Sequence, residues 1–237
     1  MKGQTRQAGP ASPPSASVET HPAPTAMRGP TQQRSVASLH RMIGTARELM
    51  LERGNEDFTL QDVSQRGKVS IGSIYHRFES KEALVRSVIG AELGRMGAGE
   101  VDMIRAALAV SQTLANYVPR YVAGFAEGLR DNSVMMRLAM QRASFDREVS
   151  GTGEARELEA SNTATIALLT YRSEIRGDCE TKARIAFQVI FATIARRLSL
   201  DTSDPFSSKQ DWALLIAELS AMTLGYLITQ PPLRQAD

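Results

Sequence analysis

The chain has 237 residues, enough for one or two domains with a sizeable core, and its 42% hydrophobic and 23% charged residues are ordinary for a soluble globular protein. The net charge of +2 is too small to identify a nucleic-acid partner by itself. A single cysteine, Cys179, excludes an internal disulfide, and three scattered histidines without a cluster of carboxylates or cysteines around them argue against a metal site.

The charge is distributed unevenly along the chain. Residues 1–90 carry 12 Lys and Arg against 8 Asp and Glu, a net of +4, whereas residues 91–237 carry 16 against 18, a net of −2. A basic N-terminal part followed by a mildly acidic C-terminal part is typical of a nucleic-acid-binding segment joined to a second domain. No signal-peptide pattern opens the sequence, and no apolar run is long enough to span a bilayer. We therefore expect a cytoplasmic protein with no membrane partner and no cofactor.

The first 33 residues are rich in proline and poor in large apolar side chains. They hold six of the ten prolines, in the sequence MKGQTRQAGPASPPSASVETHPAPTAMRGPTQQ. A segment of this composition cannot bury enough apolar surface to offset the entropy that is lost on ordering. We expect residues 1–33 to form a disordered tail.

From residue 34 onward the hydrophobic pattern is helical nearly throughout, and no sustained alternation of apolar and polar residues indicates strands. Glycine-rich and polar breaks divide this part of the chain into about nine helices. The predicted spans are 35–53, 60–66, 71–77, 81–96, 102–130, 133–148, 154–176, 179–199 and 208–229. The pattern predicts an all-α fold.

The helices over 60–66 and 71–77 are short, and short helices are marginal unless they pack as a unit. Thr59 precedes the first of them, with Asp62 three residues later. Ser70 and Ser80 precede the next two helices. All three are typical N-terminal caps.

Apolar residues of the two short helices share an inward face. They are Leu60 and Val63 in the first helix, Ile74 and Phe78 in the second, and Val69 in the turn between them. Two short helices joined by a tight turn and supported by a longer first helix form a helix-turn-helix.

The rest of the surface of the second short helix carries small and polar groups. They are Ile71, Gly72, Ser73, Tyr75, His76 and Arg77. A helix that enters the major groove needs small residues for a close backbone approach, and hydroxyl, imidazole or guanidinium groups for bases and phosphates. Helix N-termini with hydroxyl caps, such as the one at Ser70, add attraction for phosphate. Taken singly, Tyr75 is better explained as a boundary aromatic and Lys81 as a solvated side chain, but together they favour a recognition helix followed by a phosphate clamp.

Residues 40–85, HRMIGTARELMLERGNEDFTLQDVSQRGKVSIGSIYHRFESKEALV, resemble the DNA-binding region of the TetR family of transcriptional regulators. The resemblance includes the turn, the helix caps, the aromatic residue and the lysine together. The matching positions are Ala46, Gly54, Thr59, Val63, Val69, Ser70, Gly72, Ser73, Ile74, Tyr75, Phe78, Ser80, Lys81, Glu82 and Leu84.

The resemblance implies a role for individual residues of this chain. Thr59, Tyr75 and Lys81 would hold phosphates of double-stranded DNA. The residues near base edges would be Gln61, Ile71, Gly72, Ser73, His76 and Arg77.

Two positions depart from the pattern of the family. Gly67-Lys68 stand where the family usually has Ala-Gly, so we expect Gly67 to meet the backbone demand of the turn. Arg77 stands where Tyr or His is usual, which bears on the DNA sequence that is preferred.

The family's plan is a conserved head and a divergent body. It implies a DNA-binding domain over 34–80 and a ligand-binding and dimerisation domain over 81–237, in which 81–96 links the two. The predicted helices 179–199 and 208–229 each carry two apolar faces, which must both be covered. In resembling proteins the last two helices form a four-helix bundle across a homodimer. The alternative is a pair of helices fully buried in one monomer.

Aromatic and thioether side chains recur on the helices of the body. Such groups, with a few polar ones between them, are suited to binding an apolar small-molecule effector, although the same stripes are more often plain core. The candidate ligand-binding residues are Tyr117, Tyr121, Phe125, Met136, Met140, Gln141, Phe145 and Tyr171.

The leading hypothesis is a homodimeric transcriptional regulator, a repressor released from a palindromic operator by a small molecule. A second hypothesis keeps the DNA binding and removes the effector, which gives an architectural DNA-binding protein of the same fold. An enzyme is poorly supported, because the sequence has no P-loop, no Gly-x-Ser-x-Gly elbow, no dinucleotide fingerprint and no Cys/His pair. The sequence leaves open the operator, the effector, and repression as opposed to activation.

Overall fold

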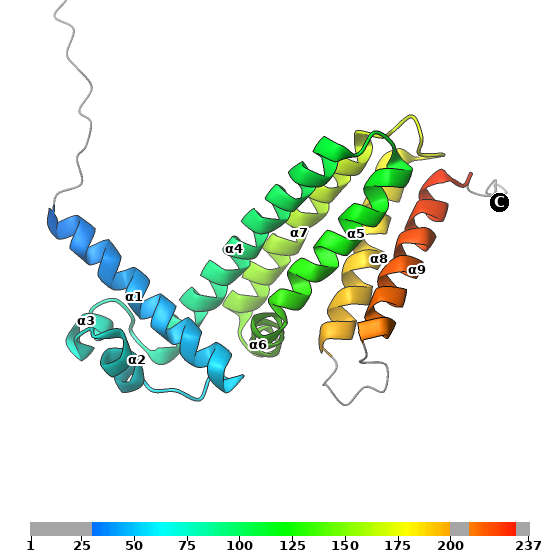
Figure 1. Cartoon of the computed structure of the whole chain (residues 1–237). Helices are drawn as coiled ribbons and strands as arrows, with labels where there is room; N and C mark the ends of the chain where they lie inside the picture. The colour runs from blue at the N-terminus through cyan, green and yellow to red at the C-terminus, as the bar shows by residue number, and fades with distance from the viewer. Residues whose placement is uncertain (1–29, 200–208, 231–237) are drawn as a thin grey trace, which may run out of the picture.

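The computed structural model of the chain describes residues 30–199 and 209–230. This part of the chain forms nine α-helices and contains no strand, so the predicted all-α class is confirmed (Figure 1). The helices are α1 (Pro30–Arg53), α2 (Leu60–Gly67), α3 (Ile71–Tyr75), α4 (Lys81–Val110), α5 (Leu114–Asp131), α6 (Ser133–Ala143), α7 (Arg147–Leu169), α8 (Cys179–Ser199) and α9 (Lys209–Ile228).

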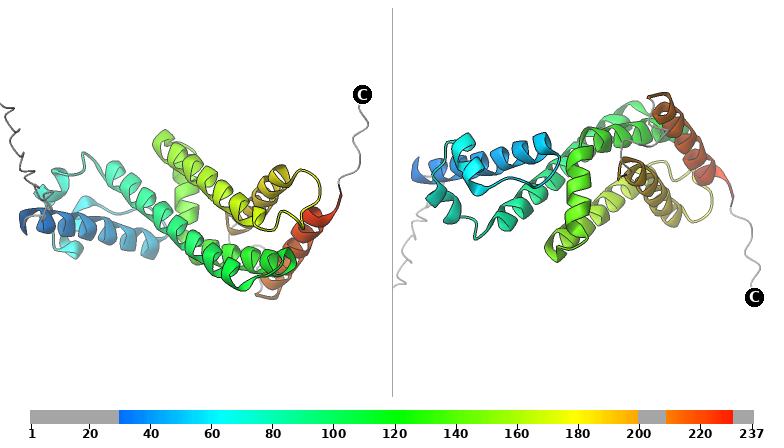
Figure 2. Two further views of the ribbon diagram at one scale, coloured as in Figure 1. Left: turned by 90° about the horizontal axis from the view of Figure 1, so that it is seen from above. Right: turned by 90° about the horizontal axis from the view of Figure 1, so that it is seen from below.

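The helices form a head and a body at the two ends of an elongated molecule. α1, α2 and α3 make up the head, and α4 leaves it to run along the body beside α5 and α7 (Figure 1). α6 lies across the bundle at the end of the body that faces the head (Figure 2). α8 and α9 pack against each other on the side of the body far from the head.

The inward faces and caps predicted for the short helices are confirmed. Val63 and Ile74 are fully buried, and Phe78 is nearly so. The Thr59 hydroxyl accepts a hydrogen bond from the Asp62 N–H at 3.1 Å, while the Asp62 carboxylate accepts one from the Thr59 N–H at 3.0 Å. This reciprocal pair satisfies two backbone donors at the start of α2.

The core of the head continues into the body. Leu84 and Val88 of α4 and Met135 and Leu138 of α6 belong to the same buried cluster as the residues of α1, α2 and α3. A second cluster fills the rest of the body. Because Met136 packs against both clusters, α6 is a structural element of both.

The prediction that Gly67 adopts the special backbone conformation of the turn between α2 and α3 is wrong. Lys68 adopts the left-handed conformation, with φ 50° and ψ 45°, whereas Gly67 is the last residue of α2. Position 67 is instead restricted to glycine by close packing, because a Cβ there would lie 2.8 Å from Oγ1 of Thr45 on α1. The turn therefore holds a lysine in a conformation that favours glycine.

The helix break predicted near Gly97–Gly99 is wrong. α4 is continuous from Lys81 to Val110, and the chain turns only at Ser111 before Thr113 caps α5. Gly97 permits a close approach inside the helix, because a Cβ there would lie 2.7 Å from the guanidinium of Arg156 on α7. Gly97 makes room for Arg156 rather than ending the helix.

The boundaries predicted for the next two helices are also wrong. α6 ends at Ala143 rather than at 148, and α7 starts at Arg147 and runs through Gly151 and Gly153 to Leu169. Asp146 causes the difference, because its carboxylate accepts a hydrogen bond from the Glu148 N–H at 3.2 Å and caps α7. Most of the predicted tail, residues 1–29, lies outside the described residues.

The C-terminal end of α9 is anchored by a buried lysine of α8. The Lys182 ammonium donates to the carbonyl oxygens of Tyr226 and Thr229, each at 2.5 Å, and burial lowers the pKa of this group. The Arg176 N–H donates to the Leu227 carbonyl oxygen at 3.0 Å. These contacts satisfy helix-end carbonyls that otherwise lack partners and fix α9 against α8.

Replacing Lys68 by glycine is expected to stabilise the protein. A non-glycine residue in the left-handed region costs about 1 kcal/mol, and Lys68→Gly removes this cost. For a chain of this size we expect Tm to rise by about 2–4 °C in thermal unfolding followed by circular dichroism. The control, Lys68→Ala, removes the same charge but keeps the Cβ and should leave Tm nearly unchanged. An equal gain in both variants would assign the effect to charge.

Candidate nucleic-acid interface and internal cavity

The side chains predicted to meet DNA lie at the starts of α2, α3 and α4. Most of them are exposed, and Tyr75 is 61% exposed although it is a large aromatic. The Lys81 ammonium at the start of α4 lies 5.0 Å from the ring centroid of Phe58, which brings it beside Thr59. The exposed residues are Thr59, Gln61, Ser70, Gly72, Ser73, Tyr75, His76 and Arg77, and the half-buried ones are Ile71 and Lys81.

The hydroxyl pair at the start of α3, Ser70 and Ser73, leaves one proton available to an acceptor in solution. Ser70 Oγ accepts from the Ser73 N–H at 3.1 Å, and Ser80 Oγ accepts from the Ala83 N–H at 3.3 Å. A hydroxyl that already accepts a backbone hydrogen bond can still donate one. The Ser70 and Ser73 hydroxyls lie 2.7 Å apart, so one of the two donates to the other and the other stays free to donate outward.

Arg77 has a partner within the head. Its Nη2 donates to the carbonyl oxygen of Ser35 on α1 at 2.9 Å and also to the Ser35 hydroxyl. This contact holds the chain after α3 against the start of α1. The structure thus gives Arg77 a positioning task, while its predicted place near base edges stays a prediction.

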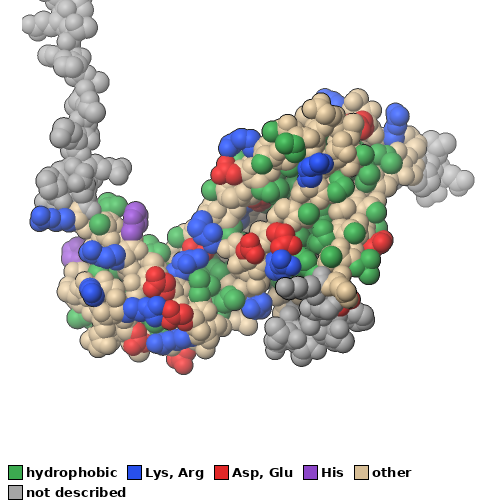
Figure 3. All heavy atoms as spheres, in the orientation of Figure 1, with side chains coloured by type: hydrophobic (Ala, Val, Ile, Leu, Met, Phe, Trp, Pro, Cys, Tyr) green, Lys and Arg blue, Asp and Glu red, His purple; other side chains and the backbone are tan. Residues whose placement is uncertain are grey.

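The head carries cations without a nearby counter-ion. Arg53 and Arg66 pair with acidic side chains of α1 and α2, as Arg47 does with Glu92. Figure 3 shows basic and histidine side chains at the end of the head where α3 lies, and acidic ones gathered lower on the head. Basic residues of the head for which the described part of the chain holds no ion-pair partner are Arg34, Arg41, Lys68, Arg77 and Lys81.

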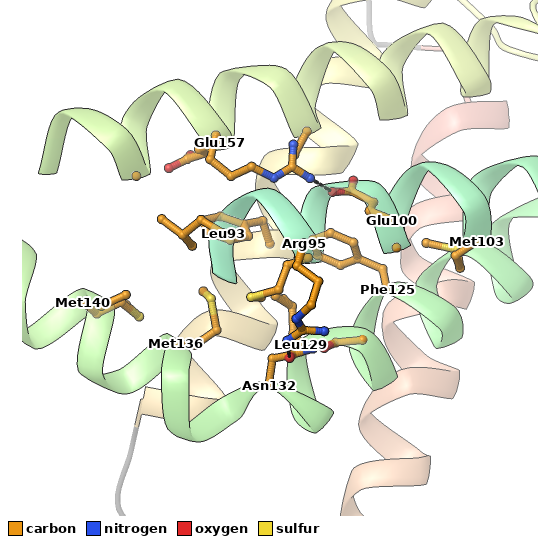
Figure 4. A pocket seen from close by; sticks show the side chains of 18 of the residues that line it. Leu93, Arg95, Glu100, Met103, Phe125, Leu129, Asn132, Met136, Met140 and Glu157 are labelled. Carbon is orange, nitrogen blue, oxygen red and sulfur yellow. Dashed lines mark hydrogen bonds and ion pairs between the residues drawn. The ribbon is translucent and has the colours of Figure 1, made fainter. Parts of the chain in front are cut away.

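The body contains a cavity of about 390 Å³ that is lined by α4, α5, α6 and α7 and by Phe191 of α8. Figure 4 shows this cavity from close by. Its lining is mostly apolar. Three helices each contribute glycine, and a Cβ at Gly124 would lie 2.8 Å from the Met103 side chain. The residues that line it are Leu93, Arg95, Met96, Gly99, Glu100, Met103, Gly124, Phe125, Gly128, Leu129, Asn132, Met136, Ala139, Met140, Ala143, Val149, Gly153, Arg156, Glu157, Ala160 and Phe191.

Three of the eight predicted ligand-binding residues, Phe125, Met136 and Met140, line this cavity. Tyr117, Tyr121 and Tyr171 lie instead in the body core, where the Tyr117 and Tyr121 rings stack with centroids 5.8 Å apart. Gln141 and Phe145 point away from the core and are exposed.

The part of the cavity wall that α4 contributes was not predicted from the sequence. Leu93, Met96, Glu100 and Met103 line the cavity, but a break was predicted in this segment. The signal that was available is the glycine pattern itself, because glycines at helical spacing in α4, α5 and α7 leave space between packed helices.

The cavity holds one buried ion pair. The Arg156 guanidinium of α7 donates to Glu100 Oε2 on α4, and the Glu100 side chain is only 8% exposed. Burial raises the pKa of Glu100, and the charge of Arg156 opposes this rise. At the other end of the cavity, Arg95 donates to Glu92 at 2.8 Å and to the Asn132 side-chain oxygen at 2.5 Å.

A buried ion-pair network joins the body to the head. Arg142 of α6 donates to Glu56, in the loop after α1, at 2.7 Å and to Asp146 at 2.8 Å. Asp146 also accepts from Arg86 of α4 at 2.9 Å. Burial alone would raise the pKa of Asp146, but the hydrogen bonds from Arg142 and Arg86 outweigh it and lower the pKa to about 2.

Comparison with known proteins agrees with this arrangement. Residues 43–88 match the family described as bacterial regulatory proteins, tetR family. The resemblance to the TetR family that the sequence indicated is therefore confirmed over this segment. No curated protein sequence matches the chain. The match covers the whole segment in which DNA contacts are predicted, Thr59 to Lys81.

Solved structures are similar over most of the chain. A protein from Mesorhizobium loti MAFF303099, described as a TetR-family transcriptional regulator, has a TM-score of 0.69 at 16% identity, covering 82% of this chain and 96% of that one. GusR of Salmonella enterica has a TM-score of 0.60 at 18% identity, with 81% and 96% covered. The fatty acid degradation regulator FadR of Bacillus halodurans has 0.58 at 18%, with 84% and 96% covered. At these identities the likeness establishes the fold alone.

Asp146→Asn is expected to destabilise the protein at pH 7, by an amount that shrinks in acid. The folded-state pKa of about 2 lies below the ordinary value of 3.8, so the carboxylate contributes stability above about pH 4 and loses it as pH falls toward 2. Urea unfolding at pH 7, 6, 5, 4 and 3 measures the gap between variant and wild type. The control is Asp102→Asn, which removes an exposed pair with Arg105 and should change little at any pH. A gap that stays constant down to pH 3 would contradict the assignment.

Proposed function

We propose that the protein is a homodimeric DNA-binding regulator, a repressor whose affinity for a near-palindromic operator is lowered by a small molecule bound in the cavity. The observation that carries the proposal is the position of α6. Met136 and Met140 of this helix line the cavity, and Arg142 of the same helix binds Glu56 of the head. A ligand in the cavity therefore contacts an element that positions the DNA-binding end.

The head supplies two kinds of DNA contact. Thr59, Tyr75 and Lys81 hold phosphates, since they offer hydroxyl and ammonium donors at the starts of α2 and α4 and at the end of α3. Base edges in the major groove are met by Gln61 and by the small and polar surface of α3. The α3 residues in this second group are Ile71, Gly72, Ser73, His76 and Arg77, and Ser70 caps the helix beside them.

The dimer forms through the outer faces of α8 and α9. One face of α8 is buried at Phe187 and Ile190, while Val189 on the other face is 46% exposed. α9 also has two faces, because Leu219 is buried whereas Met222 is 66% exposed. Figure 3 shows apolar side chains along the edge of the body where α9 lies. The exposed large apolar residues of this surface are Ile185, Val189, Leu214, Met222, Tyr226 and Ile228.

A second copy explains this surface better than a membrane does. Among the described helices, α9 is the one that is long and apolar enough to span a bilayer by length and composition, with a mean hydropathy of 1.3 over Gln210–Ile228. One face of α9 nevertheless belongs to the body core through Leu219 and Leu227, and Lys182 fixes its end. An apolar surface of this kind on a helix pair that is otherwise docked is typical of a homodimer interface.

The cavity favours a ligand-responsive regulator over an effector-independent DNA-binding protein. A volume of about 390 Å³ falls within the range of small-molecule sites, and its lining combines apolar side chains with a few polar groups. In a protein that served only to bind DNA, the four glycines of the body that line the cavity would lower helix stability with no compensating function.

Lys81→Ala is expected to weaken binding to specific and random DNA alike. Loss of one phosphate contact in each protomer, two in the dimer, should reduce the slope of log affinity against log salt by about 2. Fluorescence anisotropy between 50 and 200 mM salt, on a fragment selected by the protein from a random pool and on an unselected fragment, gives both quantities. The control is Arg105→Ala, because Arg105 is 73% exposed and lies near the far end of α4. An unchanged slope for Lys81→Ala would refute the phosphate contact.

Leu214→Glu is expected to produce a monomer. Leu214 is 60% exposed in the single chain, and a dimer would bury one unpaired carboxylate from each copy. We expect the dimer dissociation constant to rise at least about a hundredfold in analytical ultracentrifugation, with loss of tight binding to the two-half-site operator. Val110→Glu is the matched control, because Val110 is 62% exposed at the end of α4, outside this surface. A Leu214→Glu protein that remains a stable dimer would move the interface elsewhere.

A further inference from the structure

The first helix starts well before the segment that matches the family. α1 begins at Pro30, whereas the matched segment begins at residue 43, so the 13 residues 30–42 of the helix precede it. Among the described side chains of this extension, Met42 is the one that is fully buried. The exposed residues of the extension are Arg34, Ser35, Ala37, His40 and Arg41. Burial in the core therefore accounts for only part of the extension.

A contact with the chain after α3 fixes the outer end of α1. Nη2 of Arg77 donates to the carbonyl oxygen of Ser35 at 2.9 Å and also to the Ser35 hydroxyl. Arg77 lies two residues after Tyr75, the last residue of α3, whose side chain is 61% exposed. Figure 1 shows the outer end of α1 and α3 together at the tip of the head, far from the body. The extension thus lies beside the helix that is proposed to enter the major groove.

Two arginines of the extension lie on one face of α1. Arg34 and Arg41 are seven residues apart in the sequence, which corresponds to about two turns and about 10 Å along the helix axis. Both side chains are exposed, and neither has an ion-pair partner in the described part of the chain. The inner half of the same helix differs, because Arg47 and Arg53 are both paired with carboxylates.

The outer part of α1 carries no negative charge that would offset these two arginines. The first acidic residue of the helix is Glu48. Figure 3 shows basic and histidine side chains at this end of the head, whereas the acidic ones gather lower on it. A guanidinium that is exposed and unpaired beside a DNA-binding surface is suited to a phosphate, which it can meet with two parallel N–H donors.

We propose that Arg34 and Arg41 bind phosphates of the DNA strand beside the groove that receives α3, so that the DNA-binding surface extends from the helix-turn-helix onto the outer half of α1. The proposal rests on the proposed function in one respect, that α3 meets DNA. The contact between Arg77 and Ser35 keeps the outer half of α1 next to the DNA. These phosphate contacts add affinity without changing the preferred bases, because phosphates carry no direct sequence information.

The test measures DNA binding by the full-length wild type, Arg34→Ala, Arg41→Ala and the double variant. Fluorescence anisotropy between 50 and 200 mM salt is recorded on a fragment selected by the protein from a random pool and on an unselected fragment of the same length. Each single change removes two contacts from the dimer, so the slope of log affinity against log salt is expected to fall by about 2, and by about 4 in the double variant. At about 100 mM salt, each single variant is expected to lose at least about tenfold in affinity for both fragments.

Arg120→Ala is the matched control. Arg120 is an exposed arginine of α5, outside the head, and it has no ion-pair partner among the described residues. Its removal changes the net charge by the same amount and should leave the slope unchanged. Arg34→Lys keeps the charge and should keep most of the slope. Because Arg34 and Arg41 are exposed, the Tm of each variant is expected to match that of the wild type closely.

Hydroxyl-radical footprinting on the selected fragment separates direct contact from a general effect of charge. The double variant is expected to lose protection of backbone positions beside the groove that α3 occupies. Protection elsewhere in the half-site and the preferred bases should stay as in the wild type, because the helix-turn-helix itself is unchanged.

An unchanged salt slope in the double variant would overturn the proposal, and so would an equal fall in Arg120→Ala. A footprint of the double variant identical to that of the wild type would also overturn it. Each of these results leaves the proposed function intact, since the wild type still binds the selected fragment. Failure of the wild type to bind any DNA would refute the proposed function and this proposal together.

Discussion

The buried guanidinium of Arg142 is the contact on which the arrangement of head and body depends. It lies between Glu56 of the head and Asp146, the cap of α7, and Asp146 in turn binds Arg86 of α4. Arg142 is 8% exposed, and a buried charge is tolerated only while its partners remain in place. The loop after α1, the start of α4, the end of α6 and the start of α7 therefore form one interlocked unit, and movement of any one of them breaks an ion pair of Arg142 or Asp146.

This constraint explains how a small change in the cavity reaches the head. Met140 and Met136 lie about one and two turns before the end of α6, and Arg142 lies next to that end, so the cavity wall and the ion pair shift together. A hundredfold loss of DNA affinity requires about 2.7 kcal/mol of coupling, and a ligand supplies it only through its different affinity for the two arrangements. Weakening one buried ion pair is of that magnitude, so α6 needs no large displacement.

The head was predictable from the sequence to a much greater extent than the cavity. Its caps and inward faces are local signals. Thr59 and Asp62, which form the cap of α2, are three residues apart, and so are Leu60 and Val63, which are both buried. The contact of Arg77 with Ser35 joins residues 42 positions apart, and no local pattern contains it. In the body, glycines inside α4 and α7 were interpreted as helix ends, because a glycine inside a helix and a glycine that ends one look alike in the sequence. Because of that error, the cavity wall formed by α4 was not predicted.

Those glycines show how this fold obtains an internal site. Each glycine inside a helix costs about 1 kcal/mol relative to alanine, and four line the cavity: Gly99, Gly124, Gly128 and Gly153. The cavity consequently exists because side chains are absent on helices that otherwise pack closely, so its shape is set by rigid backbone. A rigid apolar space discriminates weakly among ligands of similar size, since one methylene changes affinity by only about 1–3 kcal/mol. Specificity then depends on the few polar side chains that line the wall, among them Arg95, Glu100 and Asn132.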